Sequence, residues 1–494
     1  MLRQVLNYFY VFFLKCRQHE IDYAANHPHA FQDKILKRLI AKHRKTKFGT
    51  IYYFDKISTY DDYAKLVPLQ DYESLKPYFS AVLEGEQGVV CADKIRLFAK
   101  SSGTTDKSKL IPLSYRTLYR NHFKGGKDML TLYFKNNPTS KLFCGNNLTI
   151  SGTFESAHYP RIGDISAHVV ANLPSWVKYF RCPESKIAEM SQWEDKLKGI
   201  VQQVLHEPIS CMSGVPSWMT LVLQRVKEAN TEHKPVWDKV EVFFHGGVHF
   251  RPLKEKFEQL IGRKIHYMEL YNASEGFFGI QDDLRRSDMM LLCNHEVYYE
   301  FMPLNAENEI INLTQVEIGR KYALVITTAS GLWRYQLGDV IEFTVLKPHR
   351  FIICGRTKQC INIFGEELMV HNADKGIEMV CKKMDLIVTN YTVSPKLLEN
   401  QRAVHQWLIE FEHDPKDVHE FAKRLDEALC QINSDYEAKR QGDLLLAQLQ
   451  VEIAPKGCFY NWLKQKNRLG GQYKVPKMTA DMELQTEIKN AKIN

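Results

Sequence analysis

An expected strand near position 100 ends in small hydroxyl residues followed by lysines. The segment KIRLFAK (94–100) predicts the strand. Behind it stand Ser101, Ser102, Gly103, Thr104, Thr105, Lys107 and Lys109. Backbone N–H groups and hydroxyls in such a loop can converge on an anion, and a lysine adds positive charge toward phosphate oxygens. The segment predicts a phosphate-binding loop, with a Ser/Thr-rich turn as the alternative. It lacks the Walker pattern Gly-x4-Gly-Lys-Ser/Thr.

A second expected strand, KVEVFFHGG (239–247), ends in Gly246 and Gly247. Two glycines at a strand end let a flat ring approach the backbone. His245 and His249 are four residues apart, a spacing that suits a metal pair on a helix. The intervening glycines disfavour a continuous helix, so this segment predicts a ring-binding strand end rather than a metal site.

Two acidic residues follow or interrupt expected strands. Glu275 lies in YNASEG (271–276), directly after a strand, where a carboxylate suits Mg²⁺. Its alternative role is a turn or capping glutamate. Asp339 lies in GLWRYQLGDVIEF (331–343), where it could accept both hydroxyls of a ribose or sit in a hairpin turn.

One lysine near the C-terminus stands on an expected stiff loop. Lys474 lies between a Gly-Gly turn and Pro476 in the segment GGQYKVPK (470–477). A rigid loop can present an amine to an active site, although a lysine in such a place is usually solvated. By itself, this segment predicts a solvated Lys474 on a stiff loop.

Alternating strands and helices predict an α/β fold. Further strands are expected at 264–276 and 321–330, and helices at 193–207 and 216–229. After about position 356 the pattern changes to a helix that begins at Asp414-Pro415 between two strands. We therefore expect a large multi-layer N-terminal domain, 1–355, and a small α+β C-terminal domain, 356–494.

Composition excludes several classes of protein. The 494 residues carry 66 Lys and Arg against 58 Asp and Glu, a mild formal balance of +8 that fits an anionic small molecule and does not predict nucleic-acid binding. Eleven cysteines without a Cys-x-x-Cys argue against a disulfide framework and a thiolate zinc site, and favour the cytoplasm.

One apolar run lies at the N-terminus. VLNYFYVFFL (5–14) is about half the ~20 residues of a transmembrane helix, and no small-residue cleavage site follows it. We expect a helix packed on the body of the protein, without a transmembrane segment. A peripheral membrane helix is the alternative.

The order and content of these motifs together resemble the adenylate-forming ANL superfamily of acyl-CoA synthetases, nonribosomal peptide adenylation domains and luciferases. More closely, they resemble the auxin-responsive (Gretchen Hagen) family of acyl-acid amido synthetases. SSGTT followed by Lys matches that family's phosphate loop, YNASE its Tyr-x-Ser-Ser-Glu motif, and WRYQLGD its Tyr-Arg-x-Gly-Asp region. GQYKVPK matches its terminal Gln-Tyr-Lys-x-Pro-Arg element, so the resemblance spans about 90–477.

The resemblance implies ATP and Mg²⁺ as cofactors and a role for each motif. Ser101 to Thr105 and Lys109 would hold phosphate, while Gly246, Gly247 and the segment Tyr271, Asn272, Ala273 and Ser274 would frame the adenine. Asp339 would bind the ribose, Glu275 would hold Mg²⁺, and Arg356 would lie at the hinge with Thr357. Lys474 would move in with the small C-terminal domain and neutralise charge on the carboxylate and the bridging oxygen.

Some positions depart from the family pattern. Asp106, Lys107 and Ser108 replace the usual small residues after SSGT, and Ala273 stands where the family has a serine. Gln336 and Lys477 replace arginines, which weakens any bidentate phosphate contact there.

The implied reaction is adenylation of a carboxylic acid to acyl-AMP, followed by acyl transfer to an amine, normally an amino acid, with 150–166 near the acid. An acyl-CoA ligase and a catalytically silent nucleotide-binding scaffold are the alternatives. The acid, the amine and the oligomeric state are not determined by the sequence.

Overall fold

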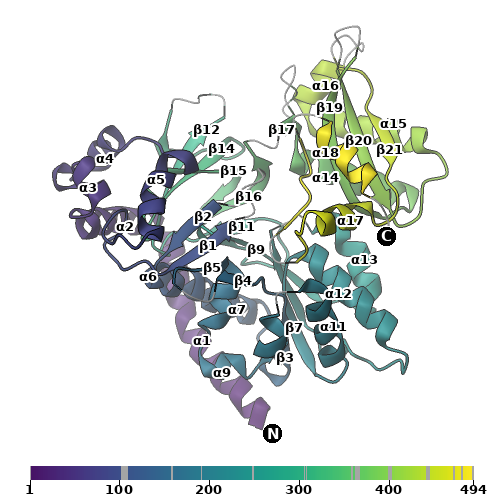
Figure 1. Ribbon diagram of the computed structural model, residues 1–494, viewed down its shortest axis with the longest axis horizontal. Coiled ribbons are helices and arrows are strands. Elements are labelled where there is room, and N and C mark those ends of the chain that lie inside the picture. The colour runs from purple at the N-terminus through teal and green to yellow at the C-terminus, as the bar shows by residue number, and fades with distance from the viewer. Residues whose placement is uncertain are drawn as a thin grey trace. The chain divides into compact units, whose positions relative to one another are not determined.

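The chain folds into two compact units in the computed structural model (Figure 1). The N-terminal unit comprises Met1–Gly247 and Lys264–Ile352, and the C-terminal unit comprises Val248–Arg263 and Ile353–Asn494. The structure describes residues 2–101, 109–156, 159–190, 192–247, 250–304, 306, 309–357, 360–361, 366, 368–398, 403–440, 446–470, 473–479 and 482–491.

Helices make up the first part of the N-terminal unit. The long helix α1 (Leu2–Asn26) packs on α7 (Phe123–Asn136), where its side chains Val11, Leu14 and Ile21 join a buried cluster with Tyr133 and Phe134. The expected packed N-terminal helix is confirmed. Shorter helices follow: α2 (Pro28–His43), α3 (Lys47–Ile51), η1 (Phe54–Lys56), α4 (Tyr60–Leu66) and α5 (Tyr72–Leu83).

Local sequence fixes where several of these helices begin. Thr59 caps α4 by accepting a hydrogen bond from the backbone N–H of Asp62, whose carboxylate accepts from the backbone N–H of Thr59. Asp71 and Ser74 form the same reciprocal arrangement at the start of α5. Each capping box satisfies donors that a helix terminus leaves unpaired.

A four-stranded sheet carries the start of the predicted phosphate loop. Its order is β2-β1-β5-β4, with β1 and β5 parallel and the other pairs antiparallel. The strands are β1 (Leu97–Ser101), β2 (Lys109–Leu113), β4 (Phe154–Ser156) and β5 (Arg161–Asp164). After β2 the chain turns into α6 (Tyr115–Thr117), a π-helix η2 (Leu118–His122) and α7.

A twelve-stranded sheet forms the centre of the N-terminal unit, in the order β13-β12-β14-β15-β16-β11-β10-β9-β8-β7-β3-β6 (Figure 1). The run β6-β3-β7-β8-β9 is parallel, and the remaining pairs for which a register is given are antiparallel. Parallel neighbours need crossover connections, which helices such as α11 (Trp193–Val204) and α12 (Pro216–Ala229) provide. The predicted helices at 193–207 and 216–229 and the α/β organisation are confirmed.

The strands of this sheet are β3 (Asn146–Thr149), β6 (Arg181–Cys182), β7 (Ile209–Gly214), β8 (Val242–Gly246), β9 (His266–Ala273), β10 (Gly276–Ile280), β11 (Met289–Leu291), β12 (Val297–Pro303), β13 (Ile311–Asn312), β14 (Lys321–Thr328), β15 (Tyr335–Leu346) and β16 (His349–Arg356). The strands expected at 239–247, 264–276 and 321–330 are confirmed as β8, β9 and β14. Short helices connect some of them: η3 (Leu142–Cys144), α8 (Ile165–Ala171), α9 (Ser175–Lys178) and α10 (Ser185–Ala188).

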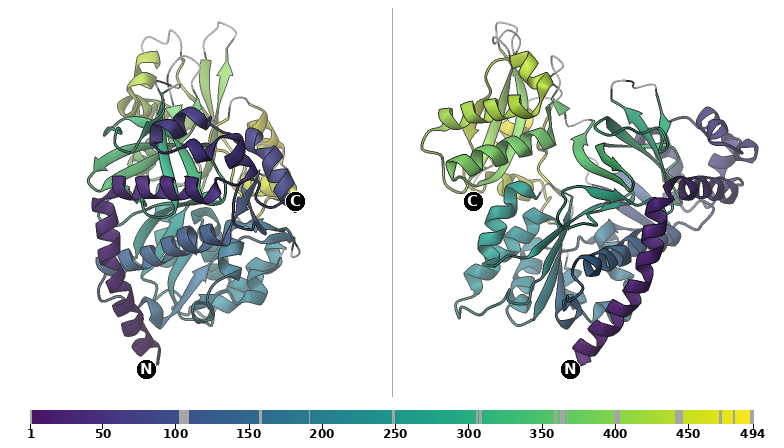
Figure 2. Two further views of the ribbon diagram at one scale, coloured as in Figure 1. Left: turned by 90° about the vertical axis from the view of Figure 1, so that its left-hand side faces the viewer. Right: turned by 180° about the vertical axis from the view of Figure 1, so that it is seen from behind.

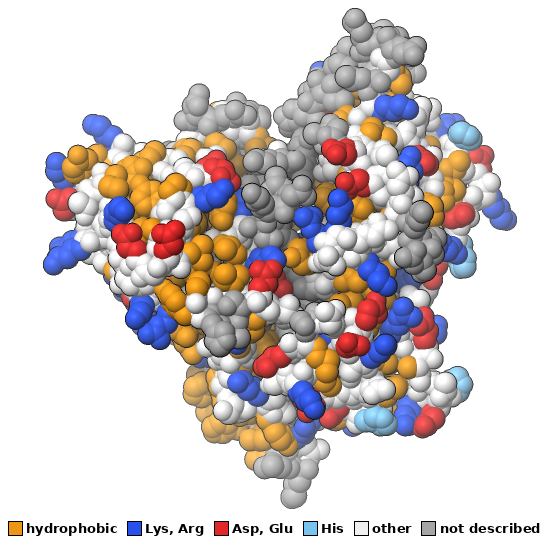
Figure 3. Space-filling model, in the orientation of Figure 1, with side chains coloured by type: hydrophobic (Ala, Val, Ile, Leu, Met, Phe, Trp, Pro, Cys, Tyr) orange, Lys and Arg blue, Asp and Glu red, His pale blue; other side chains and the backbone are white. Residues whose placement is uncertain are grey.

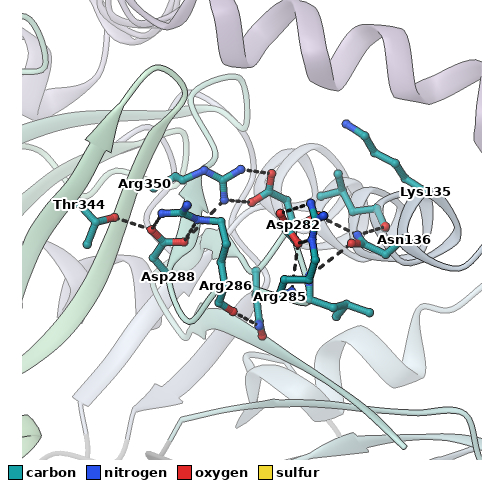
Figure 4. Close-up of polar contacts among 12 residues, drawn as sticks. Lys135, Asn136, Asp282, Arg285, Arg286, Asp288, Thr344 and Arg350 are labelled. Carbon is teal, nitrogen blue, oxygen red and sulfur yellow. Dashed lines mark hydrogen bonds and ion pairs between the residues drawn. The ribbon is translucent and has the colours of Figure 1, made fainter.

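A polar network ties the segment between β10 and β11 to the β15–β16 hairpin (Figure 4). Arg350 of β16 holds both carboxylate oxygens of Asp282, at 2.5 and 2.7 Å. Arg286 makes the same two-pronged contact with Asp288, at 2.7 and 2.6 Å, and Thr344 of β15 donates to Asp288 at 2.6 Å. Paired guanidinium–carboxylate bonds are directional, so the network fixes how these strands meet.

The C-terminal unit is the expected small α+β body. Its sheet β19-β20-β21 pairs β19 with β20 antiparallel and β20 with β21 parallel, and α14 and α15 contribute to the same core. The elements are α13 (Arg251–Ile261), β17 (Cys360–Ile361), β18 (Leu368–Met369), α14 (Val370–Met384), β19 (Val388–Leu397), β20 (Ala403–Phe411), α15 (Val418–Ile432), α16 (Ser434–Arg440), β21 (Gln450–Ile453), α17 (Cys458–Gln465) and α18 (Glu483–Asn490).

The helix expected from Asp414-Pro415 begins later, at Val418. The Asp417 carboxylate accepts hydrogen bonds from the backbone N–H groups of His419 and Glu420, at 2.9 and 3.0 Å. Asp417 is therefore the N-cap, and it sets the start of α15 in place of the Asp-Pro pair.

Candidate functional site

The hairpin β9–β10 carries the predicted acidic motif. Ala273, the last residue of β9, pairs with Gly276, the first residue of β10, so Ser274 and Glu275 form a two-residue turn. Both side chains are buried. A Cβ at Gly276 would lie 2.6 Å from the Phe278 ring, so only glycine fits at that position. The turn therefore holds the Glu275 carboxylate in a fixed, sheltered place.

The second acidic residue lies beside this hairpin. Asp339 is a buried residue of β15, and its carboxylate accepts a hydrogen bond from the Tyr271 hydroxyl at the end of β9. The Tyr271 ring contacts the rings of Phe278 and Phe351 edge-on, at centroid distances of 5.0 and 6.0 Å. This packing fixes the tyrosine, so the predicted YNASE and GD segments meet in one place.

The predicted glycine pair lies on the neighbouring strand. β8 runs parallel to β9, with Gly246 opposite Leu270, the residue before Tyr271. A Cβ on Gly246 would approach the Leu270 carbonyl oxygen to 2.2 Å, and Gly247 has a φ of 85°. Glycine is required at both positions, one for close approach and the other for its left-handed backbone.

Both ends of the predicted phosphate loop are described. Ser101, the last residue of β1, pairs with Lys109, the first residue of β2. Between them, the predicted binding residues Ser102, Gly103, Thr104 and Thr105 lie outside the described residues. The loop therefore leaves and re-enters the four-stranded sheet at one pair of neighbouring residues.

These loop ends lie against the other motifs. Ser274 of the β9–β10 turn donates a hydrogen bond to the Lys100 carbonyl oxygen at 3.0 Å. The Lys109 ammonium lies 3.4 Å from the Tyr335 hydroxyl of β15 and 5.5 Å from the centre of the Tyr72 ring. Direct contacts thus join three motifs that are separate in the sequence, while β8 joins through its pairing with β9.

A metal ion at this site would depend on few protein ligands. Within the described ranges, no group of three or more His, Cys, Asp or Glu side chains could hold an ion. Glu275 is thus a single candidate ligand. Mg²⁺ is commonly bound by one or two carboxylates, substrate phosphates and water, so the buried Glu275 carboxylate near the ends of the predicted phosphate loop fits this chemistry.

The remaining predicted residues belong to the C-terminal unit. Arg356 is the last residue of β16. Lys474 is exposed, on a segment that is anchored immediately after it. The Val475 side chain is buried, and the backbone of 477–479 bonds to both sides of Val393 in β19 (2.9 and 3.1 Å). The expectation of a stiff loop at Lys474 agrees with this anchoring.

Comparison with known proteins decides the family. The GH3 family N-terminal domain model matches residues 17–265, the GH3 family central domain 290–356, and the GH3 family C-terminal domain 371–483. The chain belongs to the GH3 family. The resemblance to the auxin-responsive amido synthetases is thereby confirmed.

Relatives of this GH3 chain match over nearly their full length. Indole-3-acetic acid-amido synthetase GH3.15 of Arabidopsis thaliana is 21% identical, covering 92% of this chain and 90% of its own. The 4-substituted benzoates-glutamate ligase GH3.12 of the same plant is 21% identical, covering 91% and 92%.

Solved structures share the fold. A structure of GH3.15 acyl acid amido synthetase has a TM-score of 0.80 at 16% identity, covering 96% of this chain and 95% of that one. A 2-hydroxyisobutyryl-CoA ligase in the postadenylation state has a TM-score of 0.61 at 13% identity, covering 94% and 93%.

The sequence analysis of this GH3 protein missed residues of the π-helix η2. His122 is buried, and its Nδ1 lies 3.0 Å from the Asn272 side-chain oxygen. Burial lowers the pKa of His122 to about 4, so the imidazole is neutral near pH 7. Asn121 accepts from the Phe277 backbone N–H at 2.6 Å and donates to the His295 carbonyl. The two residues buttress the β9–β10 hairpin, in a helix class often found at functional sites.

The segment expected near the acid, 150–166, contains the partly buried Asp164 and contacts the buried Lys196. Lys196 of α11 donates to the Ser151 carbonyl oxygen at 2.7 Å, and burial lowers its pKa to about 8. Asp164, at the end of β5, accepts from the Thr153 backbone N–H at 3.2 Å, and burial raises its pKa to about 6. The sequence analysis did not single out Lys196, whose burial depends on the segments packed against α11.

Proposed function

We propose that this GH3 protein activates a carboxylic acid with ATP and then joins the acyl group to the amine of an amino acid, forming an amide. The observation that carries the proposal is the Tyr271–Asp339 bond beside the Ser274–Glu275 turn, at the ends of the phosphate loop. Membership of the GH3 family over most of the chain supports the same function.

The first step brings two anions together. A carboxylate oxygen of the acid attacks the α-phosphorus of ATP, the new O–P bond forms, and the bond to the leaving pyrophosphate breaks. Lys109 supplies positive charge at the loop's second end, and the Ser101 end supplies a hydroxyl. Placement and positive charge are what such a reaction needs from a protein. Residues 101–105 and 109 are thus the proposed phosphate site.

The nucleoside would be held by the paired strands. A flat adenine fits beside Gly246 and Gly247, with Tyr271, Asn272, Ala273 and Ser274 as the neighbouring strand end. Asp339 uses one oxygen to accept from Tyr271, and its remaining lone pairs can accept the ribose hydroxyls. Because Tyr271 and His122 hold these groups in place before the nucleotide arrives, the site is preorganised.

Mg²⁺ would be held by Glu275 together with phosphate oxygens and water. When bound, the ion would neutralise charge on the phosphates. Glu275 itself is positioned by the two-residue turn and keeps its carboxylate in a buried location. We propose Glu275 as the metal-binding and catalytic carboxylate.

The second step transfers the acyl group. The amine nitrogen attacks the acyl carbon, a C–N bond forms, the bond to AMP breaks, and the nitrogen loses a proton.

We propose that the small domain, 356–494, moves about a hinge near Arg356-Thr357 relative to 1–355. During the first step, Lys474 of this domain would neutralise charge on the carboxylate and on the bridging oxygen. Division of the chain near 352/353 supports a hinge in this region.

An acyl-CoA ligase is the second candidate, since a fold shared with a CoA ligase supports it. The two functions use the same first step and differ in the acceptor, a thiol or an amine.

The experiment measures both half-reactions. The full-length protein is incubated with ATP, MgCl₂ and a panel of carboxylic acids, and acid-dependent exchange of labelled pyrophosphate into ATP is followed. Active acids are then supplied with CoA or with amino acids, and products are identified by mass spectrometry. We expect exchange and an amide. A thioester without amide contradicts the acceptor, and absence of exchange across a broad panel indicates a nucleotide-binding scaffold.

A further inference from the structure

The first half of α1 carries apolar side chains on both its inner and its outer side. Its inner face enters the core of the N-terminal unit through Val11 and Leu14. Its other side bears five exposed apolar side chains, with exposures of 62 to 78%: Val5, Tyr8, Phe9, Phe12 and Phe13. We call these five residues the outer face of α1. A helix that is hydrophobic on both sides is normally covered on both, so this face is built to contact something besides the protein's own core.

The outer face is one continuous stripe. Its residues follow the spacing i, i+3, i+4, i+7, i+8, which places them along one side of a helix. Figure 2 (right) shows α1 running along the outside of the N-terminal unit, and Figure 3 shows hydrophobic side chains gathered at the lower end of the molecule, toward the N-terminus. Four of the five side chains are aromatic, a composition that suits a membrane–water interface.

Aromatic side chains in and just after α9 (Ser175–Lys178) contact α1 on sides other than its outer face. Trp176, which is partly exposed, stacks on Tyr10 of α1 with ring centres 4.6 Å apart and an interplanar angle of 17°. Tyr179 is also exposed, and the Arg3 guanidinium lies 5.2 Å from its ring centre. Trp and Tyr next to a cation are typical of segments that lie in the headgroup region of a bilayer.

Basic side chains outnumber acidic ones near the outer face. Residues 1–19 contain no Asp or Glu, whereas Arg3 and Lys15 flank the stripe. Beyond it, α1 lines a cavity of about 380 Å³ with six basic and two acidic side chains. The basic residues are Arg17, Lys34, Arg38, Arg120, Lys124 and Lys127. Four of the basic side chains, those of Arg17, Arg38, Arg120 and Lys124, lie in ion pairs. Arg17 is four residues, or about 6 Å, beyond Phe13, within the ~10 Å range of unscreened charge. A negatively charged surface complements this side of the unit.

The length of the apolar run and the charge near it indicate what could cover the outer face of α1. The apolar run 5–14 is about 15 Å long, half the ~30 Å hydrocarbon thickness of a bilayer, and no described helix is long and apolar enough to cross a membrane. A second copy packed antiparallel on this face would bring Lys15 toward Arg3 of its partner, where like charges repel. A lipid surface accepts both the aromatic stripe and the cations.

We propose that α1 docks the protein on the surface of an anionic lipid bilayer. The outer face enters the boundary between headgroups and acyl chains, while the exposed Lys15 faces the anionic headgroups. The helix lies parallel to the membrane and remains packed on α7. This inference does not depend on the proposed enzymatic function.

A vesicle-sedimentation experiment tests the apolar contribution. The full chain is mixed with vesicles of phosphatidylcholine alone, or with about one third of the lipid replaced by phosphatidylserine. We expect binding to the anionic vesicles. The triple variant Phe9→Ser/Phe12→Ser/Phe13→Ser should bind at least about tenfold more weakly, because burial of each ring in lipid is lost. The matched control Ile318→Ser removes an exposed apolar side chain elsewhere and should bind like the parent.

A second arm tests the charge and the competing partner. Lys15→Gln should weaken binding to anionic vesicles about fivefold, and rising salt should weaken the parent. Thermal unfolding of each variant, followed by circular dichroism, verifies that α1 still packs. The proposal is overturned if the parent does not bind anionic vesicles, or if the folded triple variant binds as well as the parent. A dimer that the triple variant dissolves, seen by analytical ultracentrifugation in the absence of vesicle binding, would assign the face to a second copy.

Discussion

The Tyr271 hydroxyl donates a hydrogen bond to the Asp339 carboxylate across 68 residues of sequence. The bond joins β9 to β15, two strands that are not neighbours in the sheet. A carboxylate can accept several hydrogen bonds, so this bond is compatible with the ribose-binding role that we propose for Asp339.

Loss of this bond should affect nucleotide binding more than chemistry. In Tyr271→Phe the ring packing against Phe278 and Phe351 remains, but Asp339 loses a charge-assisted partner worth about 1.5–3 kcal/mol. We expect the KM for ATP to rise about tenfold with a smaller change in kcat, measured by pyrophosphate exchange. Tyr267→Phe, on the same strand, is the control and should leave the KM near the parental value. An equal response of the two variants would contradict a special role for Tyr271.

Removal of the proposed catalytic lysine should separate chemistry from binding. Lys474→Ala should lower adenylation at least about a hundredfold, because a charge opposite developing negative charge is lost. ATP binding by calorimetry and the Tm should stay near parental values, since the Lys474 side chain is exposed and Val475 anchors the segment. The exposed Lys456→Ala serves as control. Unchanged pyrophosphate exchange in Lys474→Ala would remove this lysine from the mechanism.

Neutralising Glu275 should change the response to magnesium. Glu275→Gln keeps the size of the side chain in its buried turn but removes the charge that a hard cation prefers. The Mg²⁺ concentration that gives half-maximal pyrophosphate exchange should rise about tenfold or more. Glu309→Gln provides the control. If the half-maximal concentration does not move, Glu275 holds no metal ion.

Asp164 should make stability depend on pH. Burial raises its pKa to about 6, so the folded state binds the proton more tightly than the unfolded chain. Stability from this group is therefore fully present below about pH 4 and is lost as pH rises through about 6. The free energy of unfolding of Asp164→Asn, relative to the parent, should increase by about 1–2 kcal/mol between pH 4 and pH 7, a value reduced for partial exposure.

Urea unfolding at a series of pH values measures this difference. The control Asp195→Asn replaces an exposed acid on α11 and should change stability by less than about 0.5 kcal/mol at each pH. A difference between Asp164→Asn and the parent that is constant with pH would show that Asp164 is not the titrating group.

A buried ion pair should contribute to the stability of the N-terminal unit. Arg334 contacts both oxygens of Glu300 at 3.1 Å and donates to the carbonyls of Ala64 and Val67 at 2.8 Å. Arg334→Met leaves the Glu300 charge buried without its partner and should lower the free energy of unfolding by about 3–5 kcal/mol. The partly exposed Arg320→Met should cost less than about 1 kcal/mol. Equal decreases in the free energy of unfolding for the two variants would contradict a larger contribution from the buried pair.

Motif chemistry was readable from the sequence because it is local. Small hydroxyl residues around Gly103, glycines at 246 and 247, and acids after strands each follow from turn geometry and ligand preference. Strand and helix periodicity predicted β8, β9, β14, α11 and α12 for the same reason, since alternation and helical spacing are properties of a short segment.

Contacts between distant segments were not readable in this way. The π-helix that places Asn121 and His122 on the β9–β10 hairpin resembles an ordinary helix in sequence. Whether such a segment forms i→i+5 rather than i→i+4 hydrogen bonds depends on what packs around it. Lys477, which stands where the family has an arginine, contacts the Tyr391 ring at 4.1 Å and Asn390 at 3.0 Å within the C-terminal unit. The sequence showed that position 477 departs from the family pattern, but not which residues Lys477 contacts.

The sequence also did not show to which of the two units each segment belongs. The segment 248–263 continues directly from β8, yet α13 packs with α14 and β19 in the C-terminal unit. By itself the sequence determined the family, the motifs, the alternation of strands and helices, and an unusually apolar N-terminal helix. Only the tertiary structure decided which face of that helix stays exposed, which carboxylate Tyr271 meets and how deeply Asp164 and Lys196 are buried. Burial and pairing are sums over neighbours brought from far along the chain, and no local pattern encodes those neighbours.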